Sequence, residues 1–233
     1  MILIHGGVGP ELTWEMQDPL AERWALVIPW RRGFGPSPPA ERQDFEVDAR
    51  DVGALLEAEG TAHVVGLSYG AVSTVLAASR SPERIRSLTL IEPALFGLAR
   101  DNATVRELER LSHAALFGDL PDGDRVREEF FEVAGLGGPE RVEQRREVER
   151  IARGLRFPGE ATPDVDPIIR ARIPRQVVSG GHHPGLEEMC DEIARRLDAS
   201  RERVPGAAHA VARAPGFNQR LETFLDGAER AAE

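Results

Sequence analysis

The 233-residue sequence contains no lysine, and it has one tyrosine and one cysteine, Cys190. A single cysteine excludes an intramolecular disulfide framework and is typical of the reducing cytoplasm, where we expect this protein. All 29 basic residues are arginines, and 39 acidic residues bring the formal net charge to −10. This acidic composition argues against a nucleic-acid partner, because such partners bind clustered positive charge.

Long apolar runs are absent as well. No run approaches the ~20 residues of a membrane-spanning helix, and the apolar start at residues 1–4 is too short for a secretory signal. We therefore expect no association with a membrane. With 41% apolar and 29% charged residues, the chain is typical of a folded protein with one core and at most a small additional subdomain.

The order of the remaining apolar segments predicts the fold class. Short β-branched runs alternate with longer amphipathic stretches, which is the pattern of a parallel sheet flanked by helices. We expect an α/β fold with a mainly parallel sheet of about six strands. The expected strands are residues 1–5, 24–29, 62–66, 87–91, 176–179 and 201–204, and the expected helices are 11–22, 45–59, 71–80, 186–197 and 216–229.

Residues 98–166 interrupt this alternation with helical stretches that are rich in arginine and glutamate. We expect a core of residues 1–97 and 167–233, with 98–166 forming a helical cap over the carboxyl ends of the strands. The cap charges have two interpretations. Arginines could recognise an acidic substrate, but pairs such as Glu107 and Arg110 favour solvated helix faces.

The sequence Gly66-Leu67-Ser68-Tyr69-Gly70 follows an apolar run and precedes a helix-compatible stretch. This is the strand–turn–helix context of a Gly-x-Ser-x-Gly nucleophile elbow. A serine on so sharp a turn would force side chains two positions away to collide, and glycine at those positions removes the collision. Ser68 is therefore the candidate nucleophile.

Together with three further motifs, the elbow resembles the small α/β-hydrolases, a superfamily of esterases, C–C bond hydrolases and haloalkane dehalogenases. The resemblance implies the α/β-hydrolase fold and a small-molecule substrate, with no metal or organic cofactor. In the family, the motif that here begins at Ile4 usually forms the third strand. We therefore expect the leading antiparallel hairpin to be missing here. The three further motifs are Ile4-His5-Gly6-Gly7, Arg32-Gly33-Phe34-Gly35-Pro36-Ser37 and Gly206-Ala207-Ala208-His209.

The resemblance also implies the base and the oxyanion hole. His209 occupies the place of the family's catalytic histidine, and an imidazole of near-neutral pKa is suited to take the Ser68 proton and return it later. The backbone N–H groups of Tyr69 and Gly7 would stabilise the developing oxyanion.

The acid of the triad departs from the family pattern. His183 stands where the usual aspartate is expected, and it is preceded by His182. These neighbouring histidines have no third ligand placed by the sequence, so no metal site is expected. Glu92 closes the strand after the nucleophile strand, where some family members carry their acid. We predict that Glu92 orients His209, with a serine–histidine dyad as the alternative.

These residues predict two-step acyl transfer in which Ser68 attacks an ester, thioester or related carbonyl and His209 acts as base. The same fold also supports C–C bond hydrolysis, lyase and acyltransferase activity, because pocket shape decides among them. A non-catalytic binding protein is the alternative from another class. Substrate identity is left open, and both a monomer and a homodimer fit the sequence.

Overall fold

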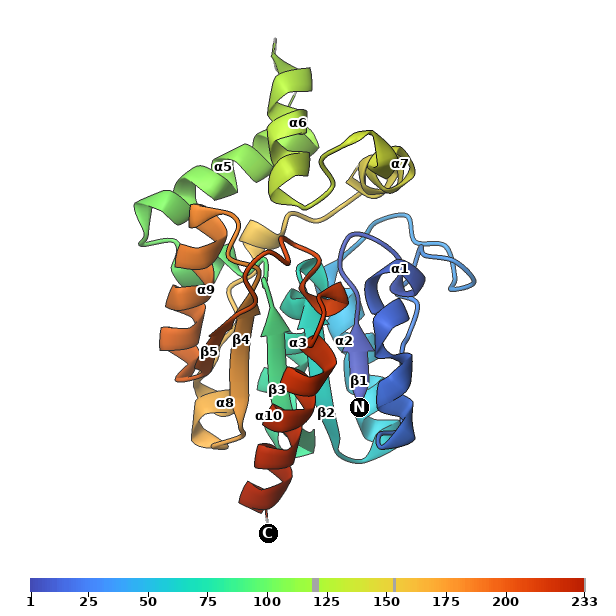
Figure 1. The fold of residues 1–233 in the computed structure, drawn as a ribbon, viewed down its shortest axis with the longest axis vertical. Coiled ribbons are helices and arrows are strands. Elements are labelled where there is room, and N and C mark those ends of the chain that lie inside the picture. Colours follow the sequence, from blue (N-terminus) through green and yellow to red (C-terminus); the bar gives the residue numbers. More distant parts are fainter. Residues whose placement is uncertain (119–121, 153, 233) are drawn as a thin grey trace.

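The computed structural model describes residues 1–118, 122–152 and 154–232 (Figure 1). These residues form one five-stranded sheet whose order is β1-β2-β3-β4-β5, with every neighbouring pair parallel. The α/β fold class is thus confirmed. The strands are β1 (Ile2–Ile4), β2 (Ala62–Leu67), β3 (Ile85–Ile91), β4 (Arg175–Ser179) and β5 (Ser200–Arg203).

The sixth expected strand, at residues 24–29, is reduced to one parallel bridge between Ile2 and Val27 at the edge beside β1. Val27 accepts a hydrogen bond from the Leu3 N–H and donates one to the Met1 carbonyl, both at 2.9 Å. Pairing stops soon afterwards because Pro29 has no N–H to donate to a ladder. The segment therefore extends the sheet without forming a regular strand.

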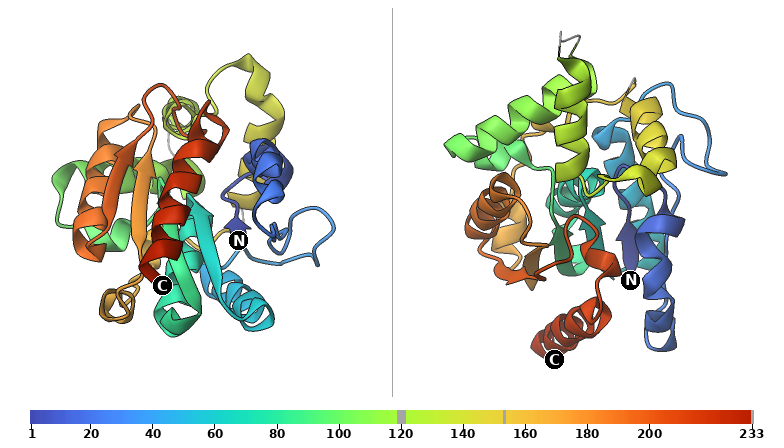
Figure 2. Two further views of the ribbon diagram at one scale, coloured as in Figure 1. Left: turned by 60° about the horizontal axis from the view of Figure 1, so that its bottom comes forward. Right: turned by 45° about the horizontal axis from the view of Figure 1, so that its top comes forward.

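Helices cover both faces of the sheet, as the turned views in Figure 2 show. Side chains alternate between the faces along each strand, so Ile2 and Ile4 belong to one apolar core and Leu3 to the other. The first face is covered by α2 (Phe45–Glu59), α3 (Tyr69–Arg80), α8 (Asp166–Arg170) and α9 (Pro184–Leu197), and the second by α1 (Pro10–Trp14), the 3₁₀ helix η1 (Glu15–Glu22) and α10 (Phe217–Ala232).

The single helix expected at residues 11–22 is wrong in part. The structure has a short α1 followed by the 3₁₀ helix η1, and Pro19 lies inside η1. Proline lacks an N–H and its ring clashes with the preceding turn, so an α-helix cannot continue through this position.

Among the described residues, four α-helices lie between β3 and α8, and α5, α6 and α7 stand beyond the carboxyl ends of the strands (Figure 1). The described residues of 98–166 contain no strand, only the isolated bridge between Gln43 and Leu155. The α-helices are α4 (Phe96–Ala99), α5 (Ala103–Phe117), α6 (Gly123–Val133) and α7 (Val142–Ala152), and the remaining 3₁₀ turns are η2 (Pro82–Arg84), η3 (Pro139–Arg141), η4 (Pro158–Glu160) and η5 (Val211–Arg213).

The charges of these helices largely face solvent. Arg110 pairs with Glu107 on the exposed face of α5, and Arg145 of α7 pairs with Glu128 of α6 at 2.9 Å. Apolar residues such as Phe131 and Ile151 are buried beneath them. In the described part of the chain, no helix is long and apolar enough to cross a membrane.

Candidate active site

Ser68 lies at the turn between β2 and α3, with φ 53° and ψ −120°. This is a strained backbone conformation for a residue with a side chain, and such strain is common at functional sites. Both glycines of the elbow are required by space. A Cβ on Gly66 would lie 2.6 Å from Thr74 Oγ1, and one on Gly70 would lie 2.3 Å from the His5 carbonyl oxygen. The turn therefore follows directly from the Gly-x-Ser-x-Gly spacing.

Glu92 follows β3 immediately, and its side chain is completely buried. Its Oε2 lies 2.5 Å from Nδ1 of His209, and its Oε1 accepts a hydrogen bond of 2.7 Å from the Gly180 N–H. The structure thus brings Glu92 and His209 together across 117 positions of sequence. An Nδ1–H held by this carboxylate leaves Nε2 of His209 as the basic nitrogen.

His183, at the position where the family usually carries its acid, has a different place in this structure. It is the N-cap of α9, where its Nδ1 accepts a hydrogen bond of 3.1 Å from the Gly185 N–H. Burial lowers the pKa of His183, and the neighbouring His182 acts in the same direction. A neutral imidazole that caps a helix cannot supply the negative charge of a carboxylate.

His182 was assigned no role from the sequence, yet it contacts the candidate acid. Its Nδ1 lies 3.5 Å from Oε1 of Glu92, and its Nε2 lies 2.8 Å from the carbonyl oxygen of Val133 at the end of α6. Only the adjacency of two histidines could have drawn attention to it. Among the described residues, no group of three or more His, Cys, Asp or Glu side chains is arranged to hold a metal ion.

The five predicted site residues line one cavity of about 130 Å³. Ser68 and His209 both line it. The hydrogen bonds of the described residues include none between these two side chains. The other three predicted residues in its wall are Gly7, Tyr69 and Glu92.

Apolar side chains form most of the remaining wall, and many of them come from the helices above the sheet. Leu108 and Leu116 belong to α5, Phe130 to α6, and Val148 and Ile151 to α7. The cavity is thus closed on the outer side by the segment that interrupts the α/β alternation.

Tyr69 lines the cavity, and the role expected for it belongs to its backbone N–H. Its N–H is among the first of α3, and such groups have no acceptor within the helix. Its buried hydroxyl donates towards the carbonyl oxygens of Gln43 at 3.3 Å and Arg156 at 3.1 Å, and burial raises the pKa of the phenol. The side chain therefore connects the elbow to the segment after α7 and is unsuited to transfer a proton.

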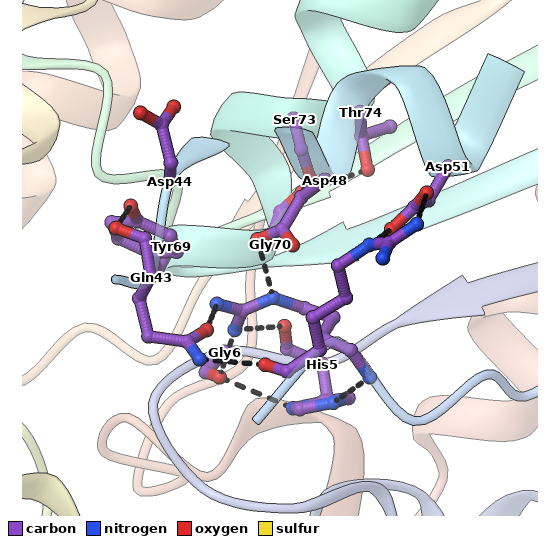
Figure 3. Close-up of polar contacts among 12 residues, drawn as sticks. His5, Gly6, Gln43, Asp44, Asp48, Asp51, Tyr69, Gly70, Ser73 and Thr74 are labelled. Carbon is purple, nitrogen blue, oxygen red and sulfur yellow. Dashed lines mark hydrogen bonds and ion pairs between the residues drawn. The ribbon is translucent and has the colours of Figure 1, made fainter. Parts of the chain in front are cut away.

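A buried polar network holds the loop that carries Gly7 (Figure 3). His5 Nδ1 donates to the Val8 carbonyl at 2.8 Å, and its Nε2 accepts a hydrogen bond of 3.1 Å from the Arg31 N–H. Burial, and next the charge of Arg31, lower the pKa of His5 to about 3, so the ring is neutral. The His5 ring thus binds the loop itself at Val8 and the neighbouring segment at Arg31, which holds the backbone of residues 5–8 in place.

Arg31 is the centre of this network. Its guanidinium donates to the Gly6 carbonyl at 2.6 Å and pairs with Asp48 of α2 at 2.9 Å, with both side chains only 4% exposed. The next residue, Arg32, pairs with Asp51 at the surface. Sequence reasoning missed Arg31 because nothing local distinguishes these two neighbouring arginines.

Comparisons with known proteins agree with this architecture. The profile of the alpha/beta hydrolase family matches residues 1–217. Lipase 3 of Moraxella sp. (strain TA144) is 34% identical over 101 residues, which are 41% of this chain and 32% of the lipase. The chain therefore aligns with about a third of that relative's length.

Two solved structures show the same fold. A membrane phospholipase A, described as a bacterial virulence factor, has a TM-score of 0.66 at 23% identity, covering 98% of this chain and 78% of that protein. A thermophilic esterase from Thermogutta terrifontis has a TM-score of 0.64 at 21% identity, covering 99% of this chain and 88% of the esterase. Because the family profile matches most of its length, the chain belongs to the alpha/beta hydrolase family of enzymes, which confirms the resemblance seen in its motifs.

Proposed function

We propose that the protein is a serine hydrolase that cleaves esters of small apolar acyl groups. The observation that carries this proposal is the Glu92–His209 pair at 2.5 Å, which lines the same cavity as Ser68 on its strained turn. The names of the Moraxella lipase and the Thermogutta esterase also support ester hydrolysis.

In the proposed first step, His209 Nε2 takes the proton from Ser68 as Oγ attacks the ester carbonyl carbon. The carbonyl oxygen gains the negative charge, and the N–H groups of Tyr69 and Gly7 stabilise it. Glu92 stabilises the imidazolium, which then protonates the departing alcohol. Water, deprotonated by His209, attacks the acyl-enzyme in the second step and releases the acid and free Ser68.

The cavity supports a small, uncharged acyl group. Its volume of about 130 Å³ is close to that of an engineered apolar cavity of about 150 Å³ that holds benzene. The two charged residues besides the histidine already have partners, since Arg31 pairs with Asp48 and Glu92 with His209. An acyl chain of up to about six carbons would fit, and a charged one would find no free counter-charge there.

Labelling with a fluorophosphonate probe tests the nucleophile. We expect the wild type to be labelled and Ser68→Ala to lose both labelling and turnover of a p-nitrophenyl ester while remaining folded by circular dichroism. Ser112→Ala is the matched control, because Ser112 lines the same cavity but its hydroxyl donates to the Leu108 carbonyl at 2.8 Å. An unlabelled wild type would indicate a binding protein, and equal labelling of Ser68→Ala would exclude Ser68.

The size of the acyl group is tested with a series of p-nitrophenyl esters. We expect kcat/KM to be highest for butyrate or hexanoate and to fall for dodecanoate, because the longer chain exceeds the cavity. A rate that rises steadily up to dodecanoate would contradict the proposed acyl size while leaving the nucleophile assignment intact.

A further inference from the structure

Glu92 has a histidine on each of its carboxylate oxygens. His209 lies at Oε2, and His182 approaches Oε1 with its Nδ1 at 3.5 Å. The rings of the two histidines are 6.5 Å apart. Glu92 itself is completely buried, whereas each histidine side chain is 18% exposed. One buried carboxylate therefore contacts two imidazoles, and the proposed reaction uses only that of His209.

The partners of His182 determine where its hydrogens lie. Its Nε2 faces the Val133 carbonyl oxygen at 2.8 Å, and a carbonyl can only accept, so Nε2 carries a hydrogen. In a neutral ring, Nδ1 would then present a lone pair to the Glu92 carboxylate. This Nδ1 is buried, and no hydrogen-bond partner satisfies it among the described residues. The lone pair of Nδ1 and the carboxylate oxygen Oε1 would then repel each other, and the low dielectric constant of the buried site strengthens this repulsion.

A protonated ring removes this conflict. The imidazolium has a second N–H at Nδ1, which points towards Oε1 of Glu92, while Nε2–H keeps its bond to the Val133 carbonyl. Both nitrogens are then donors with acceptors, and the bond to the carboxylate is charge-assisted. A short movement of the ring would bring the 3.5 Å contact within hydrogen-bond distance.

We propose that His182 is a positioning residue which, as an imidazolium, donates to Glu92 and to the Val133 carbonyl and so ties the end of α6 to the acid of the triad. This inference rests on the proposed function, because Glu92 is an acid of the triad only if Ser68 and His209 perform catalysis. The role of His182 is to hold Glu92 in place and to share its charge.

Sharing one carboxylate couples the protonation of the two histidines. A positive charge on His182 lies beside the carboxylate that also holds His209, so removing it changes the charge around both rings. Other ionisable groups lie near the same loop. They are His183 on the same loop, Glu129 of α6, whose charge acts on His183, and Glu187 of α9, which accepts a hydrogen bond from the Gly181 N–H.

The pH profile of kcat/KM for p-nitrophenyl butyrate tests this role. His182→Asn retains an N–H donor for Glu92 but loses the charge, and His182→Phe loses both. We expect the acid limb to move to higher pH in both variants, because each loses the positive charge beside the shared carboxylate. On the alkaline plateau, kcat should fall further in His182→Phe than in His182→Asn, because only asparagine can still hold the carboxylate.

The matched control is His113→Asn, which replaces a histidine of α5 outside the cavity. Its acid limb should coincide with that of the wild type. A residue that only connected α6 to the loop would change kcat or stability and leave the acid limb unmoved, so an unshifted limb in His182→Asn overturns the proposal. Labelling of Ser68 at alkaline pH tests the proposed function separately, because it does not depend on a charge at His182.

Ring ¹⁵N spectra of the wild type give a second test that does not depend on how well the variants fold. At the midpoint of the acid limb, we expect the His182 ring to have both nitrogens protonated. The buried His5 and the helix-capping His183 should be neutral there, since burial lowers the pKa of each. Absence of a doubly protonated ring that contacts the Glu92 carboxylate at this pH would overturn the role of His182.

Discussion

Glu92→Gln replaces a carboxylate oxygen by an NH₂ group with almost no change in shape, and the structure explains why this should strongly reduce activity. Glu92 accepts from two donors, the Gly180 N–H at 2.7 Å and His209 Nδ1 at 2.5 Å. A glutamine has only one oxygen. If its NH₂ group faces His209, Nδ1 must accept, and the hydrogen moves to Nε2, which then cannot take the Ser68 proton. If the NH₂ group faces Gly180, two donors meet in a buried space.

The expected magnitude follows from these two options. Either orientation also removes the negative charge that stabilises the imidazolium formed during proton transfer. In serine proteases, the equivalent loss of charge at the triad acid lowers kcat about 10⁴-fold. We expect Glu92→Gln to lower kcat about 10³- to 10⁴-fold, which is ~4–5.5 kcal/mol of activation free energy. KM should change little, since both carboxylate oxygens are occupied by protein donors.

The assay is steady-state hydrolysis of p-nitrophenyl butyrate, with circular dichroism to verify the fold and fluorophosphonate labelling to follow the reactivity of Ser68. Glu188→Gln is the control, because Glu188 is an exposed residue of α9 that accepts a hydrogen bond from Asn102. Its kcat should match the wild type. A Glu92→Gln enzyme within tenfold of the wild-type kcat would refute the triad and leave the serine–histidine dyad as the better description.

Variants of Arg31 and His5, with Arg32 as a surface comparison, test the network behind the Gly7 loop. Arg31→Met leaves the buried Asp48 carboxylate unpaired, so the free energy of unfolding should fall by ~3–5 kcal/mol and Tm by about 6–20 °C. The double variant Arg31→Met/Asp48→Leu should recover part of this loss, because it removes the unpaired charge as well. Arg32→Ala removes only a surface pair and should cost under about 1 kcal/mol in the same calorimetric measurement. His5 stays neutral in the native state down to about pH 3, whereas the unfolded chain protonates it below 6.5. Between these values its contribution to stability should fall by about 1.4 kcal/mol per pH unit as pH decreases, and urea titrations of His5→Asn should lack that component. Equal pH dependence in both proteins would show that His5 is protonated when folded.

The sequence was informative where chemistry depends on local spacing. The elbow could be located because two glycines around a serine mark a turn that has no room for side chains. A Cβ on Gly66 would meet Thr74 of the following helix, whereas one on Gly70 would meet the distant His5 carbonyl. The position of Glu92 beside His209 could be predicted because both follow strands of one parallel sheet and His183 occupies the usual place of the acid.

The rest depends on contacts between residues far apart in sequence. His182 meets the Val133 carbonyl across 49 positions, and Arg31 meets the Gly6 carbonyl across 25. No local pattern distinguishes a buried Arg31 from an exposed Arg32, because both lie before α2 and each pairs with an aspartate of that helix, Arg31 with Asp48 and Arg32 with Asp51. Tertiary packing alone assigns these roles.

The same packing holds two strained residues at the candidate site. Ser68 and Glu92 both have positive φ, at 53° and 39°, which glycine would adopt without strain. Glycine has no side chain, so these two positions must carry the strain if they are to present the proposed nucleophile and acid. Each is fixed by the neighbouring strand, since the Ser68 N–H donates to the Ile91 carbonyl and the Glu92 N–H to the Val178 carbonyl, both at 2.9 Å. The order β2-β3-β4 therefore sets Ser68 and Glu92 side by side, and Gly180 makes the room that lets the His209 loop reach them, because a Cβ at position 180 would lie 1.8 Å from the Ala208 carbonyl oxygen.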